Sequence, residues 1–147
     1  MDIKKRLLIG KAVAKKRYLS LLNKFTLNVN VLDCIVPLEE SDEIIKKTTR
    51  VEVLFYKTYL FRNKYAFKKD LSHIIDFEKE LYLWIDDSYF CGLIRMPNLR
   101  AFNFDFDFDD DPQNGIIEFF YSDVEVKINY YEDSNNHYLE LTIYSLK

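Results

Sequence analysis

Glycine, proline, cysteine and histidine are all scarce in this sequence. Its 147 residues include three glycines, three prolines, two cysteines and two histidines. So few glycines leave no glycine-rich loop of the kind that holds phosphate groups, and no dinucleotide-binding or hydrolase motif is present. Two distant cysteines are too few for a disulfide framework, which favours a reducing compartment. We therefore expect a protein that is not an enzyme and that has no bound cofactor.

Long apolar runs are also lacking. No stretch approaches the roughly 18 apolar residues that a membrane-spanning helix needs. The first residues resemble the start of a secretory signal, because Lys4, Lys5 and Arg6 precede an apolar stretch, but Lys11 interrupts that stretch too early. We expect a soluble, cytoplasmic protein with no membrane partner.

What the sequence does contain is a large supply of aromatic residues and an uneven distribution of charge. Tyrosine occurs 11 times and phenylalanine 12 times, and 48% of the residues are hydrophobic, so residues 1–147 are expected to fold as a single domain with its own core. The net charge of −3 conceals an asymmetry. Residues 1–73 carry 16 Lys and Arg against 8 Asp and Glu, whereas residues 74–147 carry 5 against 16. Such asymmetry bears on the choice of partner.

The spacing of apolar residues predicts an α+β fold. A period of three to four residues predicts helices at 2–24, 39–47 and 70–81, the last with Asp70 as its N-cap. A period of two predicts strands at 25–36 and 50–61, although a helix running on from residue 43 stays an alternative for the latter. Beyond residue 81 the period stays at two, which predicts an antiparallel meander of about five strands with helices packed on one face. The segments with this period, each a candidate strand, are 81–85, 89–96, 102–109, 116–121, 123–131 and 138–146.

The stretch from residue 101 to residue 111 alternates phenylalanine with acidic residues. In a strand, the phenylalanines at positions 102, 104, 106 and 108 would line one face, and Asn103, Asp105, Asp107 and Asp109 the other. One face must then be buried and the other exposed to water or bound to a cationic partner. This stretch predicts an acidic surface on the sheet.

The carboxylates of the same stretch also raise the question of a metal site. Asp107, Asp109, Asp111 and Glu118 match the carboxylate spacing of an EF-hand loop, but Pro112 occupies the position where the sharp turn calls for glycine. The two cysteines and two histidines are too scattered for a zinc site. We expect no metal.

The leading hypothesis for function is a small protein-binding inhibitor. An acidic surface favours capture of a basic protein, as an immunity protein or antitoxin neutralises a cationic toxin such as a nuclease. Exposed aromatic residues beside the carboxylates would anchor that partner. The predicted partner-binding residues are Asp105, Asp107, Asp109, Asp110, Asp111, Glu118, Tyr121 and Asp123.

Two other function classes stay open. A nucleic-acid-associated protein would use the basic N-terminal helix through Lys4, Lys5, Arg6, Lys15, Lys16 and Arg17, helped by tyrosines that stand among Lys57, Arg62 and Lys64. The acidic second half argues against a long phosphate tract. A small enzyme would use Cys91 as nucleophile with His73 or His137. A homodimer, in which the acidic half of one copy covers the basic helix of another, is also compatible with the charges.

Overall fold

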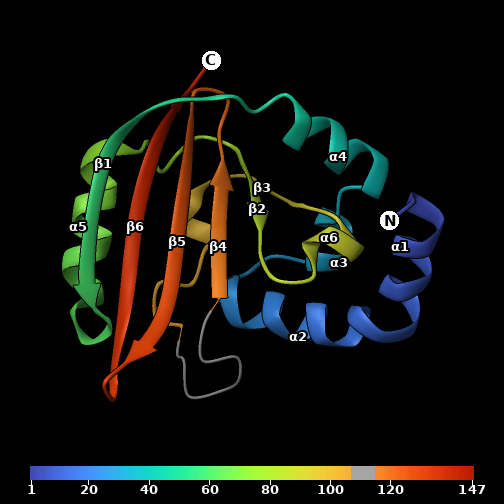
Figure 1. Ribbon diagram of the computed structural model, residues 1–147, viewed down its shortest axis with the longest axis horizontal. Helices are drawn as coiled ribbons and strands as arrows, with labels where there is room; N and C mark the ends of the chain where they lie inside the picture. The colour runs from blue at the N-terminus through green and yellow to red at the C-terminus, as the bar shows by residue number, and fades with distance from the viewer. Residues whose placement is uncertain (107–114) are drawn as a thin grey trace.

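The computed structural model describes residues 1–106 and 115–147, and it confirms the predicted α+β class (Figure 1). Six strands form one antiparallel sheet in the order β1-β6-β5-β4-β2-β3. The strands are β1 Arg50–Leu60, β2 Leu81–Trp84, β3 Ile94–Met96, β4 Gly115–Phe120, β5 Val124–Asp133 and β6 Asn136–Leu146. The predicted strands at 50–61, 81–85, 116–121, 123–131 and 138–146 are therefore confirmed.

The helices of the described residues lie behind the sheet and beside it, and they leave the front of β5 and β6 uncovered (Figure 1). They are α1 Ile3–Ile9, the π-helical η1 Gly10–Ala14, α2 Lys15–Phe25, α3 Val31–Cys34, α4 Leu38–Lys46, the 3-10 turn η2 Phe61–Asn63, α5 Lys64–Ile74, α6 Ser88–Cys91 and the 3-10 turn η3 Leu99–Ala101. The predicted helices at 2–24 and 39–47 are confirmed.

The N-terminal helix changes direction at η1, where Figure 1 shows α1 and α2 meeting at an angle. π-helical turns are a common cause of such kinks. A Cβ atom on Gly10 would lie 2.6 Å from the carbonyl oxygen of Phe90, so glycine is needed here for α6 to approach closely. The glycine that weakens the helix in sequence terms therefore has a packing role.

Two N-terminal predictions were wrong. Residues 25–36 do not form a strand, because α2 continues through Phe25 and Asn28 adopts a left-handed φ of 54°, which interrupts an extended chain. The helix predicted at 70–81 lies instead at 64–74, so Asp70 is not its N-cap. The Asp70 carboxylate instead accepts hydrogen bonds from the Tyr59 hydroxyl at 2.5 Å and from Lys57 Nζ at 3.3 Å, which join α5 to β1.

The predicted strand at 102–109 is also wrong for the residues that the structure describes. Phe102, Phe104 and Phe106 are buried and Asp105 is exposed, as the alternation predicted, but only Phe102 forms a bridge, an isolated one with Thr26. Asn103 turns the chain: its side-chain oxygen accepts from the Asp105 N–H at 3.0 Å. Residues 107–109 lie outside the described part of the chain.

In the same way, residues 89–96 are not one strand. They divide between the short helix α6 and the three-residue strand β3. The left-handed Asp87, with φ of 74°, and Gly92, with φ of 98°, flank α6 and reverse the chain on either side of it.

The main core lies between the sheet and α2, α5 and the 99–106 segment. It is built largely of aromatic rings: Phe102 stacks on Phe25 at 6.0 Å and meets Phe119 of β4 edge-on at 5.0 Å. A smaller cluster on the other side of the sheet joins Ile44 of α4 to Phe120 and its neighbours on β2 and β4. The side chains of β5 and β6 that point to that second side form the candidate functional surface.

Candidate functional site: the open face of the sheet

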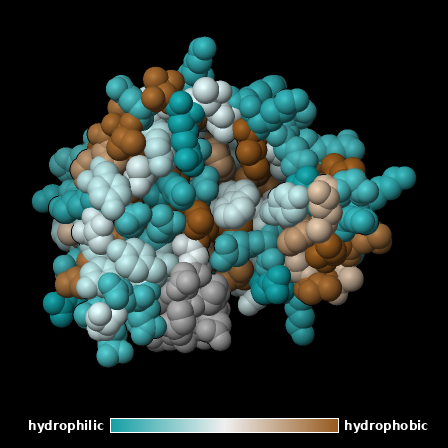
Figure 2. All heavy atoms as spheres, in the orientation of Figure 1, coloured by the Kyte–Doolittle hydropathy of each residue, from teal (hydrophilic) through white to brown (hydrophobic). Residues whose placement is uncertain are grey.

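Strands β4, β5 and β6 turn one face toward the core and the other away from it. No described helix lies in front of β5 and β6 in Figure 1, and Figure 2 shows the same side, with pale and hydrophilic residues mixed over the sheet. Cross-strand pairing places the outward side chains on one surface. We call this surface the open face; it comprises Arg50, Tyr56, Trp84, Glu118, Glu125, Lys127, Asn129, Tyr131, Tyr138, Glu140, Thr142 and Tyr144.

One carboxylate of the open face is already neutralised. Arg50 donates from Nε to Glu125 at 2.8 Å, and its guanidinium lies 4.2 Å from the ring centroid of Tyr144. The side chain of Glu125 is only 3% exposed. This ion pair connects β1 to β5. Because the carboxylate of Glu125 is buried and paired, it is not available to a partner.

A second carboxylate, Glu140, is held in place but stays accessible. The Tyr56 hydroxyl donates to one of its oxygens at 2.9 Å, and the Asn129 amide donates to the other at 3.2 Å. Beside it, the rings of Tyr131 and Tyr138 stack with their centroids 5.4 Å apart. Neither hydrogen bond neutralises the carboxylate, so this part of the face presents a fixed negative charge next to aromatic rings.

Glu118 lies in the middle of the open face, opposite Trp84 on β2 and Lys127 on β5. Burial, followed by the like charge of Glu125, raises the pKa of Glu118, while Arg50 and Lys127 act in the opposite direction. Among the described residues Glu118 forms no hydrogen bond or ion pair within contact distance. A donor brought by a partner would therefore satisfy a half-buried acceptor.

The lower end of the open face is hollowed. This acidic hollow has a volume of about 530 Å³ and is lined by Asp86, Gly115, Ile116, Asn129, Tyr130, Tyr131, Glu132 and Glu140. Three of these described lining residues are carboxylates and none is Lys or Arg. Burial and the neighbouring Asp87 raise the pKa of Asp86, with Arg17 acting against them. The hollow thus concentrates negative charge around two polar aromatic rings.

Of the predicted partner-binding residues, the four that the structure describes do not line this hollow. Glu118 lies on the open face, Asp123 is exposed at the β4–β5 turn with its carboxylate 3.7 Å from Lys79 Nζ, and Asp105 is exposed near α5, on the helix-covered side. Tyr121 is buried against the main core, and its hydroxyl has no hydrogen-bond partner among the described residues. The remaining ones, Asp107, Asp109, Asp110 and Asp111, lie outside the described residues.

Sequence reasoning missed most of the acidic hollow. Asp86, Glu132 and Glu140 come from three separate segments, and only strand pairing brings them together. The signal that could have found part of the surface is the period of two in β5, which places Lys127, Asn129 and Tyr131 on the same face.

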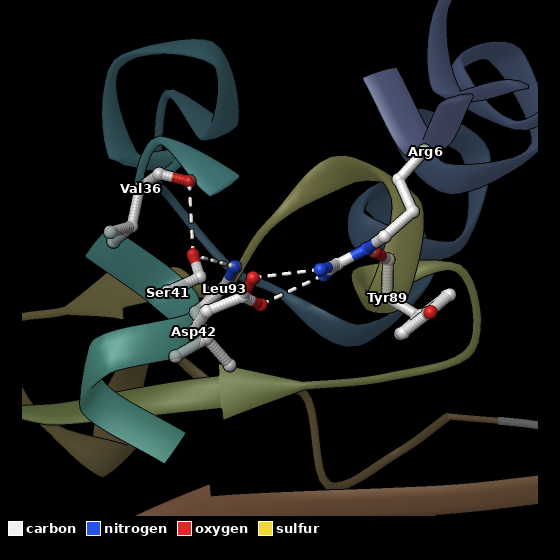
Figure 3. A network of polar contacts seen from close by, with 6 residues as sticks. All are labelled: Arg6, Val36, Ser41, Asp42, Tyr89 and Leu93. Atoms are coloured by element: carbon white, nitrogen blue, oxygen red, sulfur yellow. Dashed lines mark hydrogen bonds and ion pairs between the residues drawn. The ribbon is translucent and has the colours of Figure 1, made fainter. Parts of the chain in front are cut away.

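Arg6, predicted to contact nucleic acid, is taken up by internal contacts (Figure 3). Its guanidinium donates to both carboxylate oxygens of Asp42, at 2.7 and 2.8 Å, and its Nε donates to the Tyr89 carbonyl at 2.9 Å. These bonds lower the pKa of Asp42 and fasten α1 to α4 and α6. In the same region Ser41 Oγ donates to Val36 O at 3.1 Å and accepts from Leu93 N at 2.9 Å.

The rest of the predicted nucleic-acid surface is interrupted. Arg17 forms two hydrogen bonds with Asp87, at 2.5 and 2.6 Å. The cations of this surface that form no ion pair with a described residue are Lys4, Lys5, Lys15 and Lys16. The bend at η1 separates the first pair of lysines from the second. Hydrophobic residues gather over the same α1 and η1 end of the molecule in Figure 2; Leu8 and Val13 are both about two-thirds exposed.

No histidine is among the described charged groups that act on the pKa of Cys91, the cysteine considered as a nucleophile. Burial raises the pKa of Cys91, and the charged side chains that act on it are Asp87, Arg17 and Lys15. A raised thiol pKa reduces the fraction of thiolate, which is the nucleophilic form.

In the described part of the chain, no group of three or more His, Cys, Asp or Glu side chains could hold a metal ion, and no helix is long and apolar enough to cross a membrane.

Comparison with family models, with curated proteins and with solved structures found no match to this chain. The functional assignment therefore depends on the geometry of the open face.

Proposed function

We propose that this protein binds a cationic segment of another protein through its open face, as a non-enzymatic inhibitor of the immunity-protein or antitoxin type. The observation that supports this proposal is the acidic hollow, in which Asp86, Glu132 and Glu140 line one depression without a Lys or Arg among the described lining residues. An arginine of the partner would enter the hollow, pair with Glu140 and lie against the ring of Tyr131.

The surroundings of the hollow suit a protein interface. Tyr, Trp and Arg dominate binding energy at protein interfaces, and the open face presents Trp84 and a row of tyrosines beside its carboxylates. Because Glu140 is held by Tyr56 and Asn129, little side-chain freedom remains to be lost when a partner binds. Pre-organisation of this kind favours affinity, and the negative potential favours rapid association with a cationic partner.

A nucleic-acid-cleaving toxin is the kind of partner that this chemistry fits best. Such an enzyme exposes lysine and arginine because it must bind phosphates. A carboxylate-lined surface that covers those cations would compete directly with the nucleic acid. Inhibition of this kind requires no catalytic group, no metal and no cofactor on the inhibitor.

The proposal is tested with a tetra-arginine peptide as a probe of the hollow, using isothermal titration calorimetry at low ionic strength. The wild-type protein is expected to bind the peptide at one saturable site. The variant Asp86→Asn, Glu132→Gln, Glu140→Gln should bind at least tenfold more weakly, because each neutralised carboxylate removes a charge-assisted contact. Circular dichroism confirms that the variant is folded.

The matched control neutralises exposed acidic residues of α4, none of which lines the hollow. In Glu39→Gln, Glu40→Gln, Glu43→Gln, three carboxylates are removed while the described lining of the hollow is unchanged, and peptide binding is expected to stay within about twofold of wild type. If only this control loses binding, the peptide does not bind in the hollow. Equal binding by all three proteins would overturn the proposal as well.

A further inference from the structure

A second hollow of opposite character lies on the helix-covered side of the sheet. It has a volume of about 340 Å³, at the low end of the range for small-molecule sites, and lies between the first turns of α5 and the 99–105 segment. Its apolar lining is aromatic: Phe77 stacks on Phe104 with centroids 5.7 Å apart and planes within 3° of parallel, and Phe102 meets Phe104 edge-on at 5.0 Å. We call it the cationic hollow.

Three cations surround these rings. Lys64, Lys68 and Arg100 line the hollow, against the single described carboxylate of Asp105. Lys64 Nζ is half-buried and donates to the Phe106 carbonyl at 3.0 Å, which fixes the ammonium and leaves two of its protons for other acceptors. The positive charges of these three side chains repel one another, and an anion bound between them would reduce that repulsion.

Lys68 and Arg100 have capacity for an anion too. The ammonium of Lys68 lies 5.2 Å from the ring centroid of Phe104, and Lys68 forms no ion pair with any described residue. Arg100 pairs with Glu78 through one of its nitrogens at the exposed rim, so further N–H donors remain. Both residues, together with Phe77, also line an adjoining hollow of about 560 Å³, so the two depressions share these three side chains.

From this arrangement we infer that the cationic hollow binds a mononucleotide. The base stacks on Phe77, which lines the hollow together with the exposed Tyr65, and the phosphate lies among Lys64, Lys68 and Arg100. A planar ring that carries a phosphate is the chemistry that stacked aromatic side chains and clustered cations recognise together. The net charge of −3 opposes a longer phosphate tract, which favours a single nucleotide over a nucleic-acid strand.

The test measures binding of AMP, adenosine, inorganic phosphate and a ten-residue oligothymidylate to the wild-type protein by calorimetry at low salt. AMP is expected to bind at least tenfold more tightly than adenosine or phosphate, because only AMP engages both the rings and the cations. If AMP binds no better than phosphate, the hollow is not a nucleotide site. Tighter binding of the oligonucleotide than of AMP would overturn the choice of a single nucleotide.

Variants locate the site. Lys64→Gln with Lys68→Gln should reduce AMP affinity to that of adenosine, whereas Lys15→Gln with Lys16→Gln removes the same charge from α2 and should leave it unchanged. An equal loss in both pairs would show a general charge effect and reject the assignment. The inference does not depend on the open face: the triple variant of the acidic hollow should bind AMP like wild type, so either proposal can fail alone.

Discussion

Several arginines of this protein form ion pairs with carboxylates that are far away in sequence. Arg6 was predicted to meet nucleic acid, yet it is bound to Asp42, 36 positions later, and to the carbonyl of Tyr89. Arg17 pairs with Asp87, 70 positions away, and Arg50 with Glu125, 75 positions away. A sequence identifies these residues as cations but gives no distance to a carboxylate on another element. Their roles in fastening the fold could therefore not be predicted.

The ion pair between Arg6 and Asp42 predicts how stability depends on pH. The pKa of Asp42 is lowered by its hydrogen bonds to Arg6, so the folded state binds this proton less readily than the unfolded state. The pair therefore stabilises the fold above the unfolded pKa of about 3.9, and this contribution is lost as pH falls through the lower folded value.

Asp42→Asn removes that contribution. At pH 7 the variant should unfold with about 1 kcal/mol less free energy than wild type, a value discounted because the Asp42 side chain is 41% exposed. As pH falls through the lowered pKa of Asp42, the stabilities of the two proteins should converge. Urea unfolding at a series of pH values provides the measurement, and a difference that does not shrink as the pH is lowered would contradict the role assigned to this pair.

At the level of secondary-structure elements, the periodicity of apolar residues located most of the strands correctly. The period of two identified β1, β2, β4, β5 and β6, and the helical period identified α1 with α2, and α4. The failures have local causes. At residues 102–106 the alternation of burial is real, but Asn103 bonds to the Asp105 N–H and to the carbonyl of Lys24, so the chain turns instead of pairing as a strand.

The displaced helix shows a different limit. Residues 70–74 belong to α5 as the apolar spacing indicated, but the helix begins at Lys64 and ends at Ile74. Asp70 was assigned as its N-cap because aspartate commonly occupies that position. In the fold its carboxylate is engaged by Tyr59, a contact between two elements that no local signal reports.

The burial of the 102–106 segment leads to a second stability prediction. Phe102 is 1% exposed and contacts the rings of Phe25 and Phe119, so Phe102→Ala should cost about 3–5 kcal/mol. Phe102→Leu should cost less and stay folded. Tyr65→Ala, which removes an aromatic ring that is 82% exposed, is the matched control and should change stability by no more than about 0.5 kcal/mol. Urea unfolding compares them; similar losses for Phe102→Ala and Tyr65→Ala would show that the segment is not part of the core.

At the scale of the whole molecule, folding interleaves the basic and acidic halves of the chain. β1, from the basic half, pairs along its length with β6, from the acidic half, and the Arg17–Asp87 and Arg50–Glu125 ion pairs cross between the halves. The asymmetry in sequence therefore does not produce a basic end and an acidic end. It produces local hollows of opposite charge on opposite sides of the sheet, which composition alone could not have located.

The acidic hollow predicts a pH dependence for peptide binding. Because burial and Asp87 raise the pKa of Asp86, this carboxylate gains its proton at a higher pH than an ordinary aspartate does. Protonation of Asp86 should accordingly begin to weaken tetra-arginine binding at a higher pH than an aspartate of ordinary pKa would. In Asp86→Asn the affinity should be lower at neutral pH, and this contribution to the fall in affinity should be absent. Calorimetry between pH 7 and pH 4 gives both curves, and identical profiles would remove Asp86 from the site.

The most direct test of the open face as a binding surface is a map of the amides that respond to a cationic probe. In a ¹⁵N-labelled sample titrated with tetra-arginine, the account predicts saturable shifts at Asn129, Tyr131, Glu132 and Glu140, including the side-chain amide of Asn129, with little change along α1 and α2. Shifts confined to the stretch around Asp105, or spread evenly over the acidic residues of the surface, would contradict it.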